Sequence, residues 1–435
     1  MSHYDLVITG GHLITMDPAV PDGPATVAVR DGLIADVLPA GQEPPRAATV
    51  VDASGGIVLP GLVDTHRHTW QSATRHFGLD WSLMDYVGAA FMRLGPIVGP
   101  DDVRAATLLG ALSALDAGIT TLVDWAHIQN TPDHADAAVE ALGESGIRGV
   151  FAYGWPQTDL MKWVVDSDEP LPGDIHRVRA ALFDDHGRVT MALAARGPEM
   201  SRPSAVRRDL ELARALGLRT TMHLSDAGSV TQLDELGLLD ETVTLVHASA
   251  VADDELKRAA DLGVTASVSP LIEQTMPGLG VPATGRLKAA GVATGLSVDT
   301  EIATSGDLFA QMRAALAQHR RSEHPEPLTA RDLLAMATTG GAAATGLGDR
   351  IGSLTPGKRA DVIVVAADSV RMAPVVDPAA AVLLAAHPGL VRTVLVDGEP
   401  VKRDGVLLGP VRKALDAARD SLDRMRQAAP DLFAG

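Results

Sequence analysis

The stretch Leu59-Pro60-Gly61-Leu62-Val63-Asp64-Thr65-His66-Arg67-His68-Thr69-Trp70-Gln71 begins as an apolar run and ends in polar and aromatic residues. Successive side chains of an extended strand point to opposite faces, so His66 and His68 share one face and Arg67 lies on the other. Two neutral imidazoles at the end of a strand can bind one divalent metal ion. A His-x-His pair alone is more often two unrelated polar residues, so this interpretation depends on the rest of the chain.

The composition excludes several kinds of site and partner. The 435 residues suffice for two domains or for one barrel with an accessory layer. A formal net charge of -18, with no long basic run, argues against nucleic-acid binding and disfavours strongly anionic substrates. Because the chain contains no cysteine, a zinc site must be built from histidines and carboxylates.

The sequence shows no targeting segment and no membrane span. The first residues, Met1-Ser2-His3-Tyr4-Asp5, lack the basic and apolar regions of a signal peptide. The nearest approach to a membrane span, residues 379–386, is far too short to cross a bilayer. We therefore expect a cytoplasmic protein with no membrane partner.

The hydrophobic pattern divides the chain into three regions. Short β-branched runs bounded by Gly, Asp and Pro predict a small antiparallel β unit at the N-terminus, and similar runs return after Ile351. Between them, strands alternate with longer Ala- and Leu-rich segments, which predicts a TIM-like (β/α)8 barrel. The expected domains are a composite β-sandwich (1–58 and 353–412), a catalytic barrel (59–352) and a C-terminal amphipathic helix with its tail (413–435). The expected barrel strands are 63–66, 120–124, 149–153, 190–194, 219–223, 244–247, 264–268 and 292–298.

Polar residues gather at the ends of these expected strands, where a (β/α)8 barrel carries its functional groups. His66 and His68 end the first strand, His223 the fifth, His247 the sixth and Asp299 the eighth. Each residue alone is a weak signal. Together they place several imidazoles and one carboxylate around a single mouth, which is the ligand set that a cysteine-free metal site requires.

Three motifs, in order, resemble those of the amidohydrolase superfamily. Pro60-Gly61-Leu62-Val63-Asp64-Thr65-His66-Arg67-His68 is similar to its first-strand motif, and Gly118-Ile119-Thr120-Thr121-Leu122-Val123-Asp124 resembles the entry into its second strand. Ile351-Gly352-Ser353-Leu354-Thr355-Pro356-Gly357-Lys358-Arg359-Ala360-Asp361 resembles the return into its accessory β-sandwich. Within the superfamily, His66-Arg67-His68-Thr69-Trp70-Gln71 is most similar to the branch of triazine hydrolases and guanine, 8-oxoguanine and cytosine deaminases.

The resemblance assigns roles to individual residues. It implies that His66, His68, His223 and Asp299 hold one divalent metal, zinc or alternatively iron. It also implies that His247 contacts the attacking water or the reacting group of the substrate, and that Asp299 accepts a proton as well. The fourth strand carries no lysine that could bridge two metals, so a mononuclear site is expected. By the same resemblance Gln71 recognises a ring carbonyl or amide, and Trp70 is a second candidate for substrate binding.

The chain departs from this branch at the expected proton shuttle. Deaminases of the branch carry His-x-x-Glu after the fifth strand, whereas this chain reads His223-Leu224-Ser225-Asp226. Asp226 is one methylene shorter than glutamate and serves equally well as a cap of the next turn. Glu273, after the seventh strand, is the second candidate for the acid or base, and Glu199 is a weaker one.

These observations predict a mononuclear metal-dependent hydrolase that cleaves a C–N bond of a small nitrogen heterocycle, most simply a hydrolytic deaminase. The alternatives are a metal-dependent cyclic amide hydrolase, a hydrolase or lyase for another leaving group, and a non-catalytic barrel. The expected partner is the small heterocyclic substrate, and the resemblance allows a homodimer.

Overall fold

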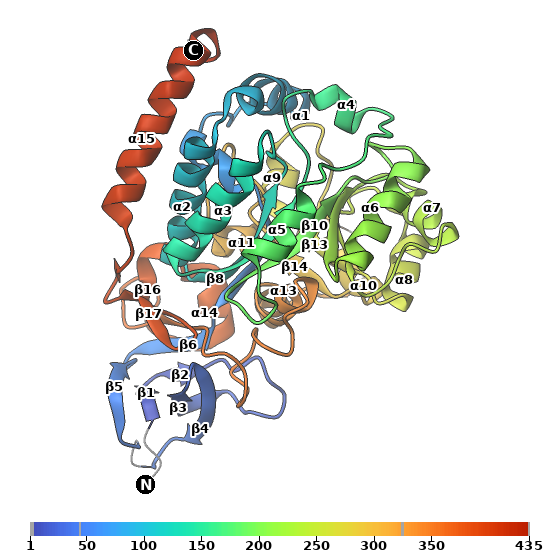
Figure 1. The fold of residues 1–435 in the computed structure, drawn as a ribbon. Helices are drawn as coiled ribbons and strands as arrows, with labels where there is room; N and C mark the ends of the chain where they lie inside the picture. The colour runs from blue at the N-terminus through green and yellow to red at the C-terminus, as the bar shows by residue number, and fades with distance from the viewer. Residues whose placement is uncertain (1–3, 43–44, 323–325, 434–435) are drawn as a thin grey trace.

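The computed structural model describes residues 4–42, 45–322 and 326–433, and it contains two sheets (Figure 1). An eight-stranded sheet, ordered β14-β13-β12-β11-β10-β9-β8-β7, pairs every strand in parallel with its neighbours. An isolated parallel bridge between Arg67 and Asp299 joins its two edges and closes the barrel. This confirms the predicted fold class. The strands are β7 (Leu62–Arg67), β8 (Ile119–Ala126), β9 (Arg148–Tyr153), β10 (Val189–Ala195), β11 (Arg219–Leu224), β12 (Val243–His247), β13 (Thr265–Val268) and β14 (Thr294–Leu296).

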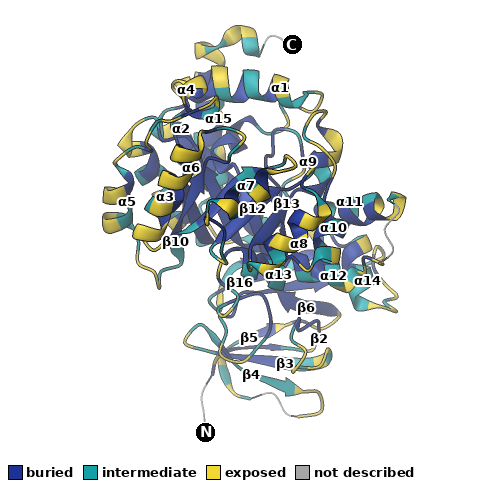
Figure 2. Cartoon of the chain, turned by 90° about the vertical axis from the view of Figure 1, so that its right-hand side faces the viewer, coloured by how far each residue is buried: buried dark blue, intermediate teal, exposed yellow. Residues whose placement is uncertain are grey.

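Amphipathic helices surround the barrel, with their exposed faces pointing outward and the strands buried behind them (Figure 2). In α8 (Asp253–Asp261), Leu256 and Ala259 are buried while Lys257 and Arg258 are exposed, as a helix with one apolar stripe requires. The other helices of this layer include α2 (Pro100–Asp116), α3 (Pro132–Ser145), α5 (Ile175–Leu182), α6 (Pro203–Ala215), α7 (Ser229–Glu235), α10 (Thr284–Ala290) and α11 (Leu308–Arg321).

The second sheet combines strands from both ends of the chain. It has ten strands, and β15 pairs antiparallel with β6, which joins the two chain ends. The sheet is mixed, because β1 pairs in parallel with β5 and β2 in parallel with β6, so the prediction of an antiparallel unit holds only for part of it. Its strands are β1 (Tyr4–Thr9), β2 (His12–Leu13), β3 (Gly23–Arg30), β4 (Leu33–Pro39), β5 (Ala47–Asp52), β6 (Gly56–Pro60), β15 (Val362–Ala366), β16 (Val391–Val396), β17 (Glu399–Arg403) and β18 (Val406–Leu407).

The connection between the two sheets is very short, since Gly61 alone separates β6 from β7. A Cβ atom on Gly61 would lie 2.0 Å from the hydroxyl oxygen of Thr120, so this close approach requires glycine. The Gly61 N–H donates to the carbonyl oxygen of Asp361 at 2.9 Å. The strand that carries His66 and His68 is therefore a direct continuation of the accessory sheet.

The C-terminal helix α15 (Val411–Ala428) lies along α2 (Figure 1). Its Ala414, Ala418 and Met425 are buried, and the Ser421 hydroxyl donates to Asp102 on α2 at 2.7 Å. Among the described residues, no helix is long and apolar enough to cross a membrane. Met1–His3, which contributed to the predicted location of the protein, fall outside the described residues.

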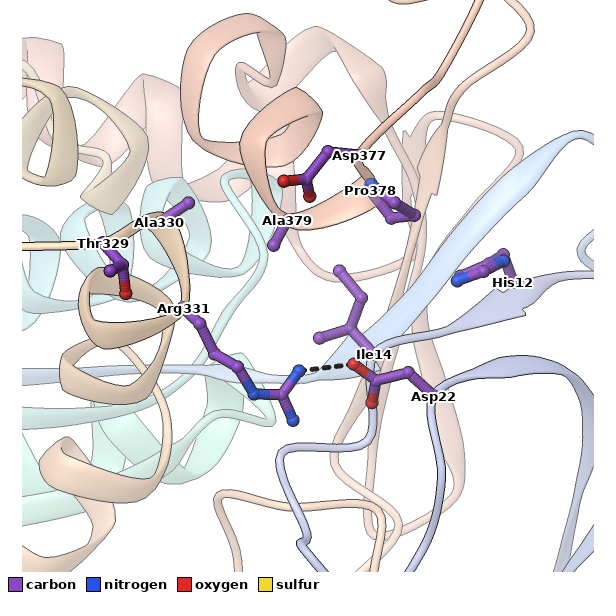
Figure 3. A pocket seen from close by; sticks show the side chains of 9 residues that line it. All are labelled: His12, Ile14, Asp22, Thr329, Ala330, Arg331, Asp377, Pro378 and Ala379. Atoms are coloured by element: carbon purple, nitrogen blue, oxygen red, sulfur yellow. Dashed lines mark hydrogen bonds and ion pairs between the residues drawn. The ribbon is translucent and has the colours of Figure 1, made fainter.

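A hollow of about 350 Å³ lies where the accessory sheet meets α12 (Ala330–Met336) and α14 (Pro378–Ala385) (Figure 3). An ion pair between Arg331 and Asp22 crosses it, and the side chain of Asp377 caps α14. None of the clustered barrel histidines lines this hollow. It belongs to the junction of the two sheets.

Arg148 at the start of β9 makes a buried ion pair with the accessory domain. It donates to both oxygens of Asp361, at 2.8 and 3.0 Å, and to Asp397, and the side chains of Arg148 and Asp361 are each 2% exposed. The Arg148→Met variant leaves a buried carboxylate without its partner, so we expect the free energy of unfolding to fall by about 3–5 kcal/mol. Urea unfolding followed by circular dichroism measures this change.

Arg202→Met is the matched control, because Arg202 pairs with Asp166 on the exposed surface. We expect it to cost less than about 1 kcal/mol. Equal losses in the two variants would contradict a structural role for the buried pair.

Candidate functional site

Three imidazoles from two strands meet at the C-terminal end of the barrel. His66 and His68 come from the end of β7 and its continuation, and His223 comes from β11. One nitrogen atom of each ring can be chosen so that all three lie within 4.8 Å of one another. The ring centroid of His66 lies 4.7 Å from that of His68 and 4.8 Å from that of His223. The structure thus brings together the histidines that the sequence singled out.

Asp299 completes this cluster from the segment after β14. Its Oδ1 lies 3.3 Å from His68 Nε2 and 3.6 Å from His66 Nε2. Its backbone N–H donates to the His66 carbonyl at 3.0 Å, and its carbonyl accepts from the His68 N–H at 2.8 Å. The same backbone pairing that closes the barrel therefore holds the carboxylate beside the imidazoles.

The donor set fits a divalent metal. His66 is fully buried, and neither of its ring nitrogens has a hydrogen-bond partner among the described residues; His223 Nδ1 has none either. Burial lowers the pKa of His66 to about 4 and that of His223 well below its ordinary value, so both rings are neutral, the form that binds metal. Although burial opposes it, interaction with His66 and His68 holds the pKa of Asp299 well below its usual range. Buried polar atoms without partners are costly, and a metal ion satisfies them.

The fourth strand offers no side chain of the kind that could bridge two metal ions. Strand β10 carries no lysine, and Arg196, which follows it, donates to both oxygens of Asp209 at 2.9 and 2.8 Å. Neither feature offers a bridging ligand for a second ion.

His247, at the end of β12, lies beside the cluster and has its own carboxylate partner. Its Nδ1 lies 2.9 Å from Oε1 of Glu273, which is 1% exposed, and its Nε2 lies 3.8 Å from Asp299 Oδ2. Burial lowers the pKa of His247, but Glu273 and Asp299 outweigh burial and raise it above the ordinary value. His247 can therefore carry positive charge next to the candidate metal ligands.

Backbone strain concentrates at this site. His247, Ala248 and Asp299 adopt positive φ angles of 74, 53 and 68°, a region that non-glycine residues rarely occupy. Such conformations persist only where the surrounding structure imposes them, and they are typical of functional sites.

A cavity of about 350 Å³ opens above the cluster. Its floor contains His68, His223, His247 and Asp299, and its walls are largely apolar and aromatic. Two carboxylates, Glu199 and Asp226, also line it, and no lysine or arginine does so among the described residues. The wall residues are Leu83, Met84, Tyr86, Val87, Phe91, His127, Trp155, Leu160, Val164, Met200, Ser225, Ile272, Met276, Gly278 and Leu279.

The remaining predicted site residues lie at different depths. Asp226 lines the cavity, whereas Glu273 lies behind His247. Gln71 is buried, and its side-chain amide exchanges hydrogen bonds with the Tyr86 hydroxyl at 2.7 and 2.9 Å. Trp70 is buried against Phe91 and His127, at ring-centroid distances of 6.4 and 5.7 Å. Gln71 and Trp70 thus support the aromatic residues that face the cavity.

The sequence interpretation gave little weight to Glu199 and assigned no role to His127, yet both line the cavity. Each follows a barrel strand, Glu199 after β10 and His127 after β8. Position after a strand was therefore the one available signal. It does not distinguish side chains that turn inward from those that remain in solvent.

Comparison with known proteins identifies the family. The family model described as "Amidohydrolase family" matches residues 57–401. A 5-methylthioadenosine/S-adenosylhomocysteine deaminase of Symbiobacterium thermophilum is 30% identical, over 92% of this chain and 94% of the relative. An 8-oxoguanine deaminase of Pseudomonas aeruginosa is 28% identical, over 95% of this chain and 96% of the relative.

Solved structures share the fold along nearly the whole chain. A zinc-bound adenosine deaminase from Xanthomonas campestris superposes with a TM-score of 0.86 at 24% identity, covering 98% of this chain and 99% of that one. A triazine hydrolase from Arthrobacter aurescens superposes with a TM-score of 0.84 at 23% identity, covering 96% of this chain and 99% of that one. The sequence resemblance is confirmed: the chain belongs to the amidohydrolase family of metal-dependent enzymes and is a hydrolase of carbon–nitrogen bonds.

Proposed function

We propose that the protein is a mononuclear zinc-dependent deaminase of a neutral heterocyclic base or nucleoside, with iron as the alternative metal. The observation that carries this proposal is the group of three imidazoles, two of them buried, around Asp299 at the floor of an apolar cavity. Relatives over nearly the full length are named as deaminases of adenine- or guanine-containing compounds. His66, His68, His223 and Asp299 would hold the ion.

The bound ion supplies a Lewis acid that makes water acidic enough to attack near neutrality. His247 lies beside the site, and its raised pKa favours the charged ring, which would stabilise the negative charge that develops on the substrate when water adds to the ring carbon. Glu273 fixes the orientation of the His247 ring through Nδ1 and so directs Nε2 toward the substrate. Asp299 completes the ligand set and is our candidate for the acceptor of one of the two water protons. The apolar walls exclude bulk water and strengthen these interactions.

The residues of the cavity wall favour a flat and uncharged substrate. Tyr86, Phe91 and Trp155 offer aromatic surfaces for a heterocycle, and Gln71 and Trp70 hold these surfaces from behind. Phosphate groups would meet the carboxylates of Glu199 and Asp226 and no lysine or arginine among the described lining residues. We therefore expect bases and nucleosides to be preferred over nucleotides.

A second reaction class uses the same site with another leaving group, such as the substituent of a triazine. It is favoured by Asp226, which stands in the cavity where the related deaminases carry glutamate. The mass and amine content of the product separate the two classes. A homodimer and a cytoplasmic location stay predictions from the sequence.

Uncharged substrates should be turned over faster than their phosphorylated counterparts. With zinc-loaded protein, we expect ammonia release from at least one of adenosine, 5'-deoxyadenosine, 5'-methylthioadenosine and 8-oxoguanine. The rate with adenosine 5'-monophosphate should be at least about tenfold below that with adenosine, because an uncompensated like charge costs more than about 1.4 kcal/mol at short range. A coupled ammonia assay measures both, and failure of the whole panel would contradict the deaminase proposal.

Metal content should depend on the histidine cluster. We expect His223→Ala to lose most of its zinc and at least about 1,000-fold in kcat, since removing a ligand abolishes both binding and activation of water. Plasma emission spectrometry after dialysis measures the zinc. The control is His186→Ala, an exposed histidine far from the barrel mouth, which should retain one zinc per chain. Equal zinc contents in the two variants would exclude His223 as a ligand.

The Glu273→Gln variant should show whether Glu273 orients His247 or instead supports metal binding. The amide oxygen still accepts from His247 Nδ1, but the negative charge is lost, so we expect kcat to fall about 10–100-fold with zinc content unchanged. Glu140→Gln makes the same chemical change on the exposed surface and should have no effect. Loss of zinc from Glu273→Gln would show instead that Glu273 supports the ligand cluster.

A further inference from the structure

We propose that Glu199 is the catalytic residue that carries the proton from water to the leaving nitrogen, in place of a carboxyl group on the loop after His223. This inference rests on the proposed deaminase function. It assigns the one role that the ligand cluster and the His247–Glu273 pair leave open.

Glu199 reaches the site from a neighbouring loop. It lies between β10 and α6, and its Oε1 accepts hydrogen bonds from the backbone N–H groups of Ser225 and Asp226, both at 2.7 Å. The Ser229 hydroxyl donates to the same oxygen at 3.2 Å. Three donors on one oxygen fix this carboxylate against the loop that follows the candidate ligand His223. That loop is where the related deaminases carry their glutamate.

The other oxygen of Glu199 is available. Among the described residues, Oε2 accepts no hydrogen bond and forms no ion pair, and Glu199 lines the same cavity as His223 and His247. Because Oε1 is occupied as an acceptor, a proton taken up by this carboxyl group resides on Oε2, the oxygen that is available to a substrate.

Asp226 lacks this anchoring. Its backbone N–H is one of the donors to Glu199, while its own carboxylate takes part in no hydrogen bond or ion pair with the described residues. Both Glu199 and Asp226 are exposed, but the side chain of Asp226 is one methylene shorter. General acid catalysis requires a group held within hydrogen-bonding distance of the reacting atom. The geometry therefore favours Glu199 over Asp226.

The proposed transfer balances without a further reactant. The water oxygen forms a bond to the ring carbon, and one water proton passes to Glu199 Oε2. The exocyclic carbon–nitrogen bond then breaks, its electron pair moves to nitrogen, and that nitrogen takes the proton from Oε2 and leaves as ammonia. The second water proton, which Asp299 accepts, goes on to the ring nitrogen, so an amino group and water become ammonia and a ring amide with no oxidation or reduction.

Glu199→Gln tests the inference with little risk to the fold, because the amide oxygen still accepts from the three donors. The substrate is whichever of adenosine, 5'-deoxyadenosine, 5'-methylthioadenosine and 8-oxoguanine the wild type turns over fastest. We expect kcat to fall about 100- to 10,000-fold. KM, zinc content and melting temperature should stay close to those of the wild type. Glu211→Gln, the same change on the exposed face of α6, is the matched control and should keep wild-type activity.

A structural readout is independent of turnover. The slow variant can be crystallised with intact substrate, and the residue 199 side chain should lie about 2.6–3.2 Å from the exocyclic nitrogen. The inference is overturned if kcat of Glu199→Gln stays within tenfold of the wild type, or if its side chain lies out of reach of that nitrogen. A 100-fold loss in Asp226→Asn with near-normal Glu199→Gln would overturn it in favour of Asp226. Wild-type inactivity on the whole panel would overturn the deaminase proposal, and this inference with it.

Discussion

The site depends on how the barrel closes. The first strand β7 meets the segment after the last strand through two backbone hydrogen bonds, from Asp299 N–H to the His66 carbonyl and from His68 N–H to the Asp299 carbonyl. Buried side chains reinforce the seam, because Asp64 accepts from the Val298 N–H and Arg67 donates to the Gly306 carbonyl. A barrel that failed to close here would separate Asp299 from the imidazoles. Closure of the barrel therefore also brings the candidate metal ligands together.

Closure also explains why the polar residues of this seam are tolerated in the core. Arg67 is fully buried yet is held by Asp64 at 2.7 Å, with Glu301 at 3.9 Å. Glu301 in turn accepts from Ser72 at 2.6 Å. His66 and His68 point to one face of β7, and Arg67 to the other, as strand periodicity requires. One short segment thus supplies two of the candidate metal ligands on one side and a stabilising charge network on the other.

The sequence was most informative where a side chain's position follows from its place on a strand. The fold and the grouping of His66, His68, His223, His247 and Asp299 follow from the rule that the strand ends of a barrel share one mouth. The parallel pairing of β1 with β5 could not be predicted, because sequence patterns define strands but not their partners. The depth of Gln71 could not be predicted either, because its side-chain amide bonds to Tyr86, a contact between two short helices, η1 (Thr69–Thr74) and α1 (Leu83–Tyr86). The fixed position of Glu199 could not be predicted for a similar reason, since its partners Ser225 and Asp226 belong to another loop.

The four carboxylates near the cavity differ in function because they differ in the donors around them. Asp299 faces two imidazoles, which stabilise its charge and suit it to bind a metal. Glu273 is buried behind His247 and acts through that ring. Glu199 is fixed by hydrogen bonds to one oxygen only, whereas the carboxylate of Asp226 has no partner among the described residues. A group that repeatedly gains and loses a proton needs a fixed position without a permanent counter-charge. Of the four, Glu199 alone meets both conditions, so its surroundings, more than its place in the sequence, suit it to carry the proton.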